Sequence, residues 1–543
     1  MRNKQAEVVE HEFDFIVSGA GSAGCVVAAR LSENGRYSVL LLEAGPQDTA
    51  FWIKPPMGYP MLFADRRVNW MFESEPEAEL KGRRMYQPRG KVLGGTSSIN
   101  GMLYIRGNAR DYDDWRQRGC EGWSYEDVLP YFRKAEDQQR GPDAYHGVGG
   151  PLCVSDQPDR SEIAEAIVEA AQQAGIPYNP DFNGAEQDGA GFFQTTTRDN
   201  RRWSTAQADL HPARTRSNLK VENGAHARRL LIANGRATGI AYRTRAGDRI
   251  AKARCEVIVC GGAFGSPQLL QLSGIGPAEH LREAGIVPLH DLPGVGANLM
   301  DHFYISMMFR CSKPITINEL ANSPLRKLKA GLEYVLLKKG PLASNGIYAG
   351  VFTRTDERQD RPNLQINTNI WTVQSRTAAG MKAHPFPGFT MSPVHLNPRA
   401  VGSVRLRGPN PLADPVIRQN FLTERTDVDT MIAAVKLVRG IADQPALAPY
   451  NAGEISPGAD ARSDLEIEEY VRSAAIANLH PVGSCRMGAG DDCVVDARLR
   501  VRGLRSLRIA DASIMPTLPS GNTNAPSIMI GEKCADMVLH DAC

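Results

Sequence analysis

The sequence predicts an α/β protein with more than one domain, and three observations support this prediction. A chain of 543 residues is too long for one small core and corresponds to about two to four domains. An apolar content of 42%, with 51 Gly and 35 Pro, is typical of an α/β protein slightly rich in loops. Near the N-terminus, a β-prone segment, a glycine-rich turn, a helical pattern and a second β-prone segment follow one another, as in a parallel βαβ unit.

The charge balance and the hydropathy pattern exclude several classes of partner. The 63 Lys and Arg balance the 61 Asp and Glu to a net charge of +2, which gives no reason to expect nucleic acid or an anionic membrane surface as the main partner. No apolar run approaches the roughly 18 residues of a transmembrane segment. Residues 1–12 are polar, without the apolar core of a signal peptide. We therefore expect a cytoplasmic protein without a transmembrane segment, and peripheral association with the inner membrane stays open.

The cysteines and histidines show no metal-binding pattern. The ten cysteines form no Cys-x-x-Cys pair, and the eleven histidines show neither His-x-His nor His-Glu-x-x-His spacing. The chain is also much longer than a disulfide-stapled scaffold. We expect reduced, mostly structural thiols and no metal ion.

The N-terminal βαβ pattern can be assigned element by element. Residues 13–18 are a short β-prone run, as expected of a buried parallel strand. A helical pattern begins at Ser22 after the glycines and ends before Asn34-Gly35, which is a helix stop signal. Residues 38–42 form the second strand, and Glu43 closes it. This order is that of a Rossmann-type unit.

Each glycine of this turn has a physical task. Gly19 permits the tight turn, Gly21 lets the backbone approach a pyrophosphate, and Gly24 lets the helix pack on the sheet. The helix N-terminus offers N–H donors and a positive dipole end to phosphates. Glu43 lies 19 residues after Gly24, where an acid accepts a hydrogen bond from a ribose hydroxyl. The pattern predicts a dinucleotide site, without separating NAD from FAD.

Four longer motifs carry a resemblance to a known family, the glucose–methanol–choline (GMC) oxidoreductases. They extend over nearly the whole chain and most resemble the choline dehydrogenase-like and aliphatic alcohol dehydrogenase branch. The segments are 89–102 (RGKVLGGTSSINGM), 262–270 (GAFGSPQLL) continued by 273–276 (SGIG), 480–488 (HPVGSCRMG), and 511–513 (DAS) with 521–526 (GNTNAP).

The resemblance implies FAD as the cofactor and two intertwined domains. The Rossmann-type FAD-binding domain would take residues 12–310, with some insertions of the other domain, and return over 476–543. Residues 311–475 would form a substrate domain built on an antiparallel sheet with helices. Short strands are expected at 218–221, 228–232 and 257–260, on the FAD-binding side.

The resemblance also assigns cofactor-binding positions. Ala227 would contact the adenine through its backbone, and small residues at 94–98 would let the main chain approach a flat ring. Some family members attach FAD through a histidine, but this chain has Ile99 there, so noncovalent FAD is expected. The full set of expected cofactor-binding residues is Gly19, Gly21, Ser22, Ala23, Gly24, Glu43, Ala44, Trp70, Val92, Gly94, Gly95, Thr96, Asn100, Gly101, Met102, Leu103, Ala227, Asp511, Ala512, Asn522 and Thr523.

The catalytic expectation rests on His480 and Asn522. Oxidation of an alcohol removes a hydroxyl proton and a hydride from the adjacent carbon, and a histidine titrates in the range that suits a proton acceptor. His480 lies in the family's catalytic segment and is the candidate base, with hydride passing to flavin N5. Asn522 matches the second member of the pair and would donate to the developing alkoxide. Asp301-His302 is expected to be structural.

The predicted function is FAD-dependent oxidation of an alcohol, most simply a primary one, to the aldehyde. Electrons would pass to a quinone or another acceptor; an O₂-using alcohol oxidase that produces H₂O₂ shares every motif, and a lyase on a flavin scaffold is a third reading. We favour an aliphatic or aryl alcohol over choline, since no aromatic cage with an acid can be located by spacing. Tyr348, Trp371, Phe386 and Phe389 are candidates for either the substrate pocket or the core.

Overall fold

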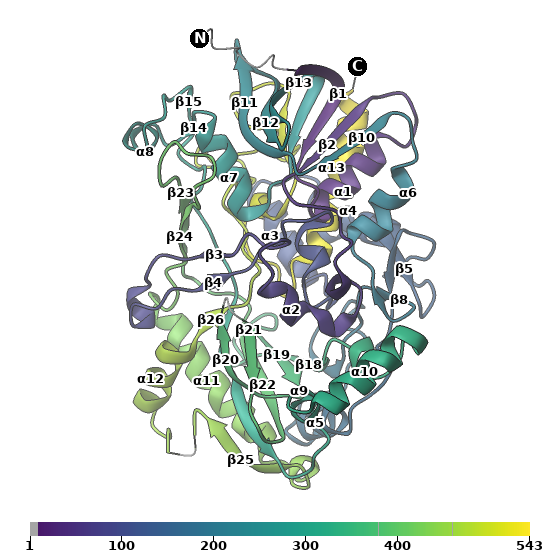
Figure 1. Ribbon diagram of the computed structural model, residues 1–543. Coiled ribbons are helices and arrows are strands. Elements are labelled where there is room, and N and C mark those ends of the chain that lie inside the picture. The colour runs from purple at the N-terminus through teal and green to yellow at the C-terminus, as the bar shows by residue number, and fades with distance from the viewer. Residues whose placement is uncertain (1–8, 378–379, 459, 543) are drawn as a thin grey trace, which may run out of the picture.

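The computed structural model describes residues 9–377, 380–458 and 460–542. The expectation that the chain starts without a signal peptide concerns residues 1–12 and falls mostly outside the described residues. Two large sheets organise the fold, one in the upper and one in the lower half of Figure 1. Within these ranges, none of the helices combines the length and the apolarity that crossing a membrane requires.

The first sheet is of the Rossmann type. Its order is β10-β2-β1-β13-β12-β11, and β27 also pairs with β13. Pairing is parallel from β10 through β2 and β1 to β13 and on to β27, whereas β11, β12 and β13 are antiparallel. The strands are β1 (Val9–Ser18), β2 (Val39–Glu43), β10 (Leu219–Asn223), β11 (His226–Ala233), β12 (Arg236–Thr244), β13 (Gly247–Val259) and β27 (Leu507–Ile509). The predicted α/β class with a Rossmann-type unit is confirmed.

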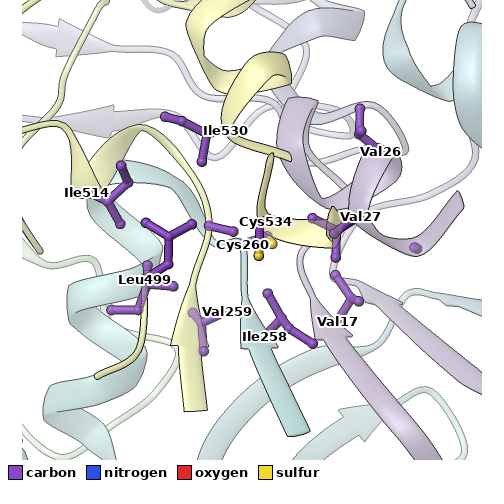
Figure 2. Packing of buried hydrophobic residues seen from close by; sticks show 14 of the residues in the cluster. Val17, Val26, Val27, Ile258, Val259, Cys260, Leu499, Ile514, Ile530 and Cys534 are labelled. Atoms are coloured by element: carbon purple, nitrogen blue, oxygen red, sulfur yellow. The ribbon is translucent and has the colours of Figure 1, made fainter. Parts of the chain in front are cut away.

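Two helices from opposite ends of the chain cover one face of this sheet. α1 (Ser22–Leu31) and α13 (Asn524–Asp541) pack along each other, and Figure 2 shows Val27 and Ile530 above Ile258 in the shared core. At Gly531 a Cβ would lie 2.8 Å from the Ala23 carbonyl oxygen, so only glycine allows this approach.

A buried ion pair also joins these helices. The Arg30 guanidinium donates two-pronged hydrogen bonds of 2.7–3.0 Å to Glu532, whose side chain is fully buried. Lys134, from α4 (Tyr125–Ala135), lies 3.0 Å from the same carboxylate. The C-terminal helix is thus tied to the first helix of the chain by packing and by charge.

The second sheet is antiparallel, in the order β25-β17-β22-β19-β18-β7, with β16 between β22 and β26. α5 (Glu162–Gln173) and α11 (Arg425–Ala442) pack on one of its faces. Its strands are β7 (Gly189–Phe192), β16 (Phe303–Tyr304), β17 (Met307–Cys311), β18 (Ile347–Thr353), β19 (Leu364–Asn369), β22 (Gly388–His395), β25 (Asn451–Ser456) and β26 (Ile476–Ala477). The sheet thus takes strands from outside 311–475, and the domain limits stay a prediction.

The remaining elements connect or flank the two sheets. The helices are α2 (Tyr59–Phe63), α3 (Ala109–Gln117), α6 (His211–Ala213), α7 (Gly262–Leu272), α8 (Ala278–Glu283), α9 (Ile317–Ala321), α10 (Pro324–Leu337) and α12 (Asp464–Ala474). The short strands, paired in twos, are β3 (Phe72–Glu73), β4 (Tyr86–Gln87), β5 (Glu136–Gln138), β6 (Leu152–Val154), β8 (Thr197–Arg198), β9 (Arg201–Arg202), β14 (Ile275–Gly276), β15 (His290–Asp291), β20 (Val373–Thr377), β21 (Gly380–Ala383), β23 (Ser403–Arg405) and β24 (Val416–Arg418).

Candidate active site

A cavity of about 400 Å³ lies between the two sheets and is lined from both. One end is formed by the glycine turn after β1, the segment that follows β4, and the start of α13. The other end is formed by strands of the antiparallel sheet, by α2 and by the β20–β21 ribbon. We call the first the backbone end, because glycines and main-chain groups form much of its wall. We call the second the side-chain end, because side chains form its wall.

The glycine turn gives the backbone end its shape. Gly19 has a φ of +106°, and a Cβ there would lie 2.4 Å from the Cys260 carbonyl oxygen. At Gly24 a Cβ would lie 1.8 Å from the Gly19 carbonyl oxygen, so this glycine allows α1 to pack on the turn. At Gly21 and Gly262 a Cβ would meet no protein atom within 4 Å, and both residues line the cavity. The backbone is therefore open to a bulky group at these two points, as a dinucleotide requires.

The acid at the end of β2 holds the turn and faces the cavity. Glu43 accepts hydrogen bonds from the backbone N–H of Ala20 at 3.0 Å and of Gly45 at 2.8 Å. Burial raises the pKa of this carboxyl to about 7. Its oxygens keep further lone pairs, so this carboxylate can also accept a hydrogen bond from a sugar hydroxyl.

The segment after β4 and the start of α13 complete the backbone end. Gly94 donates its N–H to the Ala20 carbonyl at 2.8 Å, and a Cβ on Gly95 would lie 2.6 Å from the Cα of Gly21. Asn524 accepts a hydrogen bond of 2.8 Å from the Ser22 hydroxyl. Two helix N-termini, those of α1 and α13, therefore meet at the cavity and direct positive dipole ends into it.

Most of the expected cofactor-binding residues line this cavity. The lining set includes Gly19, Gly21, Ser22, Ala23, Glu43, Ala44, Trp70, Gly95, Thr96, Asn100, Gly101, Met102, Leu103, Ala227, Asp511, Ala512, Asn522 and Thr523. Three expected residues do not line it, namely Gly24, Val92 and Gly94. Gly24 and Gly94 instead shape the turn, and Val92 is buried in a cluster with Ile99.

His480 lies in the cavity wall between the two ends. The residue before it, Leu479, has a φ of +68°, which is uncommon for a residue other than glycine. The backbone N–H of His480 donates to the Asp301 carboxylate at 2.7 Å, and this hydrogen bond fixes the main chain here. Burial, together with the neighbouring His302 ring and the charge of Arg89, holds the pKa of His480 well below its usual range. The imidazole is therefore neutral near neutral pH and can accept a proton.

His302 determines which nitrogen of His480 carries the proton. The Nε2 of His302 lies 3.0 Å from the Leu396 carbonyl oxygen, which can only accept, so this nitrogen bears a hydrogen. Burial lowers the pKa of His302 to about 3, so its Nδ1 is unprotonated. That Nδ1 lies 3.1 Å from the Nδ1 of His480, which must therefore donate. The lone pair of His480 is left on Nε2, facing the cavity.

Two amides accompany His480. Asn522 directs its amide Nδ2 at the His480 Nε2 lone pair, 3.1 Å away. The Asn478 Nδ2 lies 3.3 Å from His480 Nδ1, and a turn of this amide about its last bond would place its oxygen opposite the Nδ1 proton. A hydroxyl that reaches Nε2 would thus find a proton acceptor and an amide donor side by side.

The side-chain end is formed by the polar face of the antiparallel sheet. Along β19, Leu364 and Ile366 point into the core, whereas Asn367 and Asn369 line the cavity. β22 alternates in the same way, and its Ser392 and Thr390 pair in register with those two asparagines. The other lining side chains at this end include Tyr59, Phe63, Tyr304, Ser306, Ile347, Trp371, Val373 and Met381.

The structure changes several expectations for this end. Of the four aromatic candidates, Trp371 lines the cavity; Phe389 and Tyr348 are core residues, and Phe386 stacks on His384 outside it. Tyr59, Phe63 and Tyr304 were missed, as was the contact of His302 with His480. The alternation of residues 364–369 (LQINTN) was the signal that could have identified the polar wall. Among the described residues, no group of three or more His, Cys, Asp or Glu is placed to hold a metal ion.

Comparison with known proteins extends the resemblance over nearly the whole chain. Residues 13–304 and 398–531 match the GMC oxidoreductase family. The alcohol dehydrogenase (acceptor) of Pseudomonas putida is 42% identical over 97% of this chain and 96% of its own length. The oxygen-dependent choline dehydrogenase of Vibrio vulnificus is 41% identical over 98% and 95%. The crystal structure of pyridoxine 4-oxidase from Mesorbium loti covers 98% of this chain and 100% of that chain, with a TM-score of 0.88 and 31% identity.

Proposed function

The chain belongs to the GMC oxidoreductase family and is an FAD-dependent oxidoreductase that acts on alcohols, and from this premise we propose that it oxidises a primary alcohol to the aldehyde through His480 and Asn522. The observation that carries the proposal is the lone pair on His480 Nε2, held at the cavity by the hydrogen bond to His302. FAD, when bound, supplies the hydride acceptor.

His480 would take the hydroxyl proton of the alcohol on Nε2. Its Nδ1 proton stays in the hydrogen bond to His302. In the imidazolium that forms, the new Nε2–H points at the substrate oxygen. The Asn522 amide N–H, now 3.1 Å from Nε2, would turn to the substrate oxygen and stabilise the negative charge that develops there. A donor at this point acts mainly in the transition state, where the charge on the oxygen is largest.

The cofactor would be held noncovalently by the residues of the backbone end. Ile99 occupies the place where a histidine attaches FAD in some relatives, and its side chain is fully buried in an apolar cluster. Acid precipitation of the purified protein should release all of the yellow flavin into the supernatant. Flavin that stays with the pellet and fluoresces in a denaturing gel would contradict this part of the proposal.

The substrate would be a neutral alcohol, aliphatic or aryl, in preference to choline. Among the described residues that line the cavity, the only carboxylates are Glu43 and Asp511, and both are at the backbone end. Asp511 is occupied there by the Gly262 N–H at 2.9 Å and the Ser266 hydroxyl at 2.6 Å. A quaternary ammonium group would find aromatic rings at the side-chain end without an acid beside them.

The acceptor and the reaction class are tested together. A panel of alcohols, with choline included, is mixed with the holoenzyme without oxygen, and bleaching of the flavin identifies substrates. Absence of bleaching by every alcohol would favour a lyase and overturn the proposal. For a substrate found in this way, we expect reduction of an artificial quinone with little H₂O₂; near-stoichiometric H₂O₂ would make the protein an oxidase. A cytoplasmic location is part of the proposal, and cell fractionation tests it.

A further inference from the structure

The outer face of α10 is an exposed apolar stripe. Ser323 caps the helix by accepting from the Arg326 N–H, and Pro324 occupies its first turn. On the inner face, Ala330 and Tyr334 are buried against the protein. The opposite face presents Leu325, Leu328, Leu332, Val335 and Leu336, each exposed by between 50% and 76%. The helix is therefore apolar on the side that faces away from the core, the reverse of an ordinary surface helix.

This stripe holds a large share of the exposed apolar side chains of the surface. Of the sixteen large apolar side chains that are exposed in the described part of the chain, six lie on α10. Isolated exposed leucines are common, but a contiguous stripe marks an interaction surface. α10 lies on the outside of the lower half of the molecule in Figure 1, and the apolar side chains of its outer face stay exposed in the described chain.

The charges around the stripe are nearly all positive. Residues 324–339 contain Arg326, Lys327, Lys329, Lys338 and Lys339, with Glu333 as the one acid in this segment. The side chains of Arg326, Lys327 and Lys329 are exposed. The chain-wide charge of +2 hides this local excess, which is why the composition alone gave no reason to expect an anionic surface as partner.

We propose that α10 docks on the surface of an anionic phospholipid bilayer. In this arrangement the leucine stripe enters the boundary between headgroups and acyl chains, and the flanking lysines and arginine contact lipid phosphates. Exposed apolar and basic faces on one helix that is too polar overall to span a membrane are typical of interfacial helices. A symmetric contact with a second copy fits less well, because it would bring ten basic residues together with two glutamates.

The position of α10 connects this surface with the cavity. After α10 the chain forms a short 3₁₀ turn, Pro341–Ala343, which packs on a second one, Pro56–Gly58. The latter leads directly into α2, whose Tyr59 and Phe63 line the cavity while Met61 is 53% exposed. Docking would therefore bring the α2 wall of the cavity close to the lipid, where a lipid-soluble quinone can be reached. This last step rests on the proposed quinone acceptor, whereas the docking itself does not.

The test measures binding of the holoenzyme to vesicles by flotation. We compare vesicles of phosphatidylcholine alone with vesicles that also contain phosphatidylglycerol. The wild-type protein should float with the anionic vesicles. The double variant Leu328→Glu with Leu332→Glu should bind them at least about tenfold more weakly, since each leucine gives up apolar burial. Leu412→Glu with Leu465→Glu adds the same charge at exposed leucines elsewhere and should bind as wild type does.

Charge is tested separately. Lys327→Gln with Lys329→Gln should weaken binding to anionic vesicles and reduce its loss at high salt, whereas Lys436→Gln on α11 should change neither. Wild type that stays unbound, or control variants that lose binding to the same degree, would overturn the proposal. A wild-type dimer in solution that Leu328→Glu with Leu332→Glu dissociates would show instead that the stripe is an interface between copies.

The final comparison separates docking from catalysis. The α10 variants should keep wild-type flavin reduction by alcohol in solution, and lose turnover only with a long-chain quinone embedded in anionic vesicles. If flavin is reduced by no alcohol, the proposed function fails while the docking result still stands.

Discussion

The two ends of the cavity recognise their ligands by different means. The backbone end presents glycines, helix N-termini and main-chain N–H groups, whereas the side-chain end presents alternate residues of an antiparallel sheet and four aromatic rings. A backbone wall tolerates few residue types, because a Cβ at Gly24 or Gly95 would overlap main-chain atoms. A side-chain wall accepts many residue types without loss of the fold. The cofactor is therefore recognisable in the sequence, and the alcohol is not.

His480 stands where the two ends meet, and its replacement should have the largest effect. His480→Ala should lower the rate of flavin reduction by alcohol by about 10²–10⁴-fold, because the proton acceptor is lost. Anaerobic stopped-flow absorbance measures this rate. Flavin content should stay at the wild-type level, and a near-normal rate would end the assignment of His480 as the base.

The pH dependence of the same step sharpens the placement of His480. Because burial lowers the pKa of His480 below 6.5, the base is neutral and active above that pH and becomes protonated only in more acidic solution. The rate of flavin reduction at low substrate concentration should be constant above pH 6.5. It should fall by about tenfold per pH unit once the pH is below the pKa of His480. A loss of rate that already begins above pH 6.5 would contradict the buried environment of His480.

A bulkier residue at Gly21 should break the backbone end alone. Gly21→Val would place methyl groups in the space left open beside the turn and weaken FAD binding by about 1–3 kcal/mol, which is roughly fivefold to 150-fold in affinity. The ratio of flavin to protein after dialysis measures this loss. Gly440→Ala on α11, where a Cβ also meets nothing within 4 Å, is the matched control and should keep its flavin.

Loss of the His302 acceptor should have a smaller effect on rate. His302→Phe removes the partner of His480 Nδ1 and should slow flavin reduction by about tenfold. His302→Asn, which can keep an acceptor at the δ position, should recover part of the rate. A purely structural role would change the thermal stability of both variants and leave the acid limb of the pH profile in place, whereas the positioning role moves that limb for His302→Phe.

The smallest effect is expected for one ring of the side-chain end. Trp371→Ala should raise the KM for a good alcohol substrate by about threefold, through lost apolar contact, and leave flavin content unchanged. Phe386→Ala removes a ring that does not line the cavity and is the control. Equal effects of the two replacements would mean that Trp371 does not contact the substrate.

This contrast also explains how far the sequence reached. The strand, turn, helix and acid from residue 13 to Glu43 could be predicted because each depends on local geometry that few residues satisfy. The placement of His302 against His480 could not, because it depends on packing between segments 178 positions apart. The outward leucines of α10 follow the 3.6-residue period, but periodicity does not say which face of a helix is buried.

The link between Arg30 and Glu532 has a consequence for synthesis of the chain. The two residues are 502 positions apart, and the Ser22 hydroxyl donates to Asn524 across the same distance. A ribosome that has made the first strands and glycine turn therefore still lacks the helix that completes their core and the second helix N-terminus at the cavity. The flavin site can form only once residues 524–541 have left the ribosome, so a product truncated before residue 524 should emerge without cofactor.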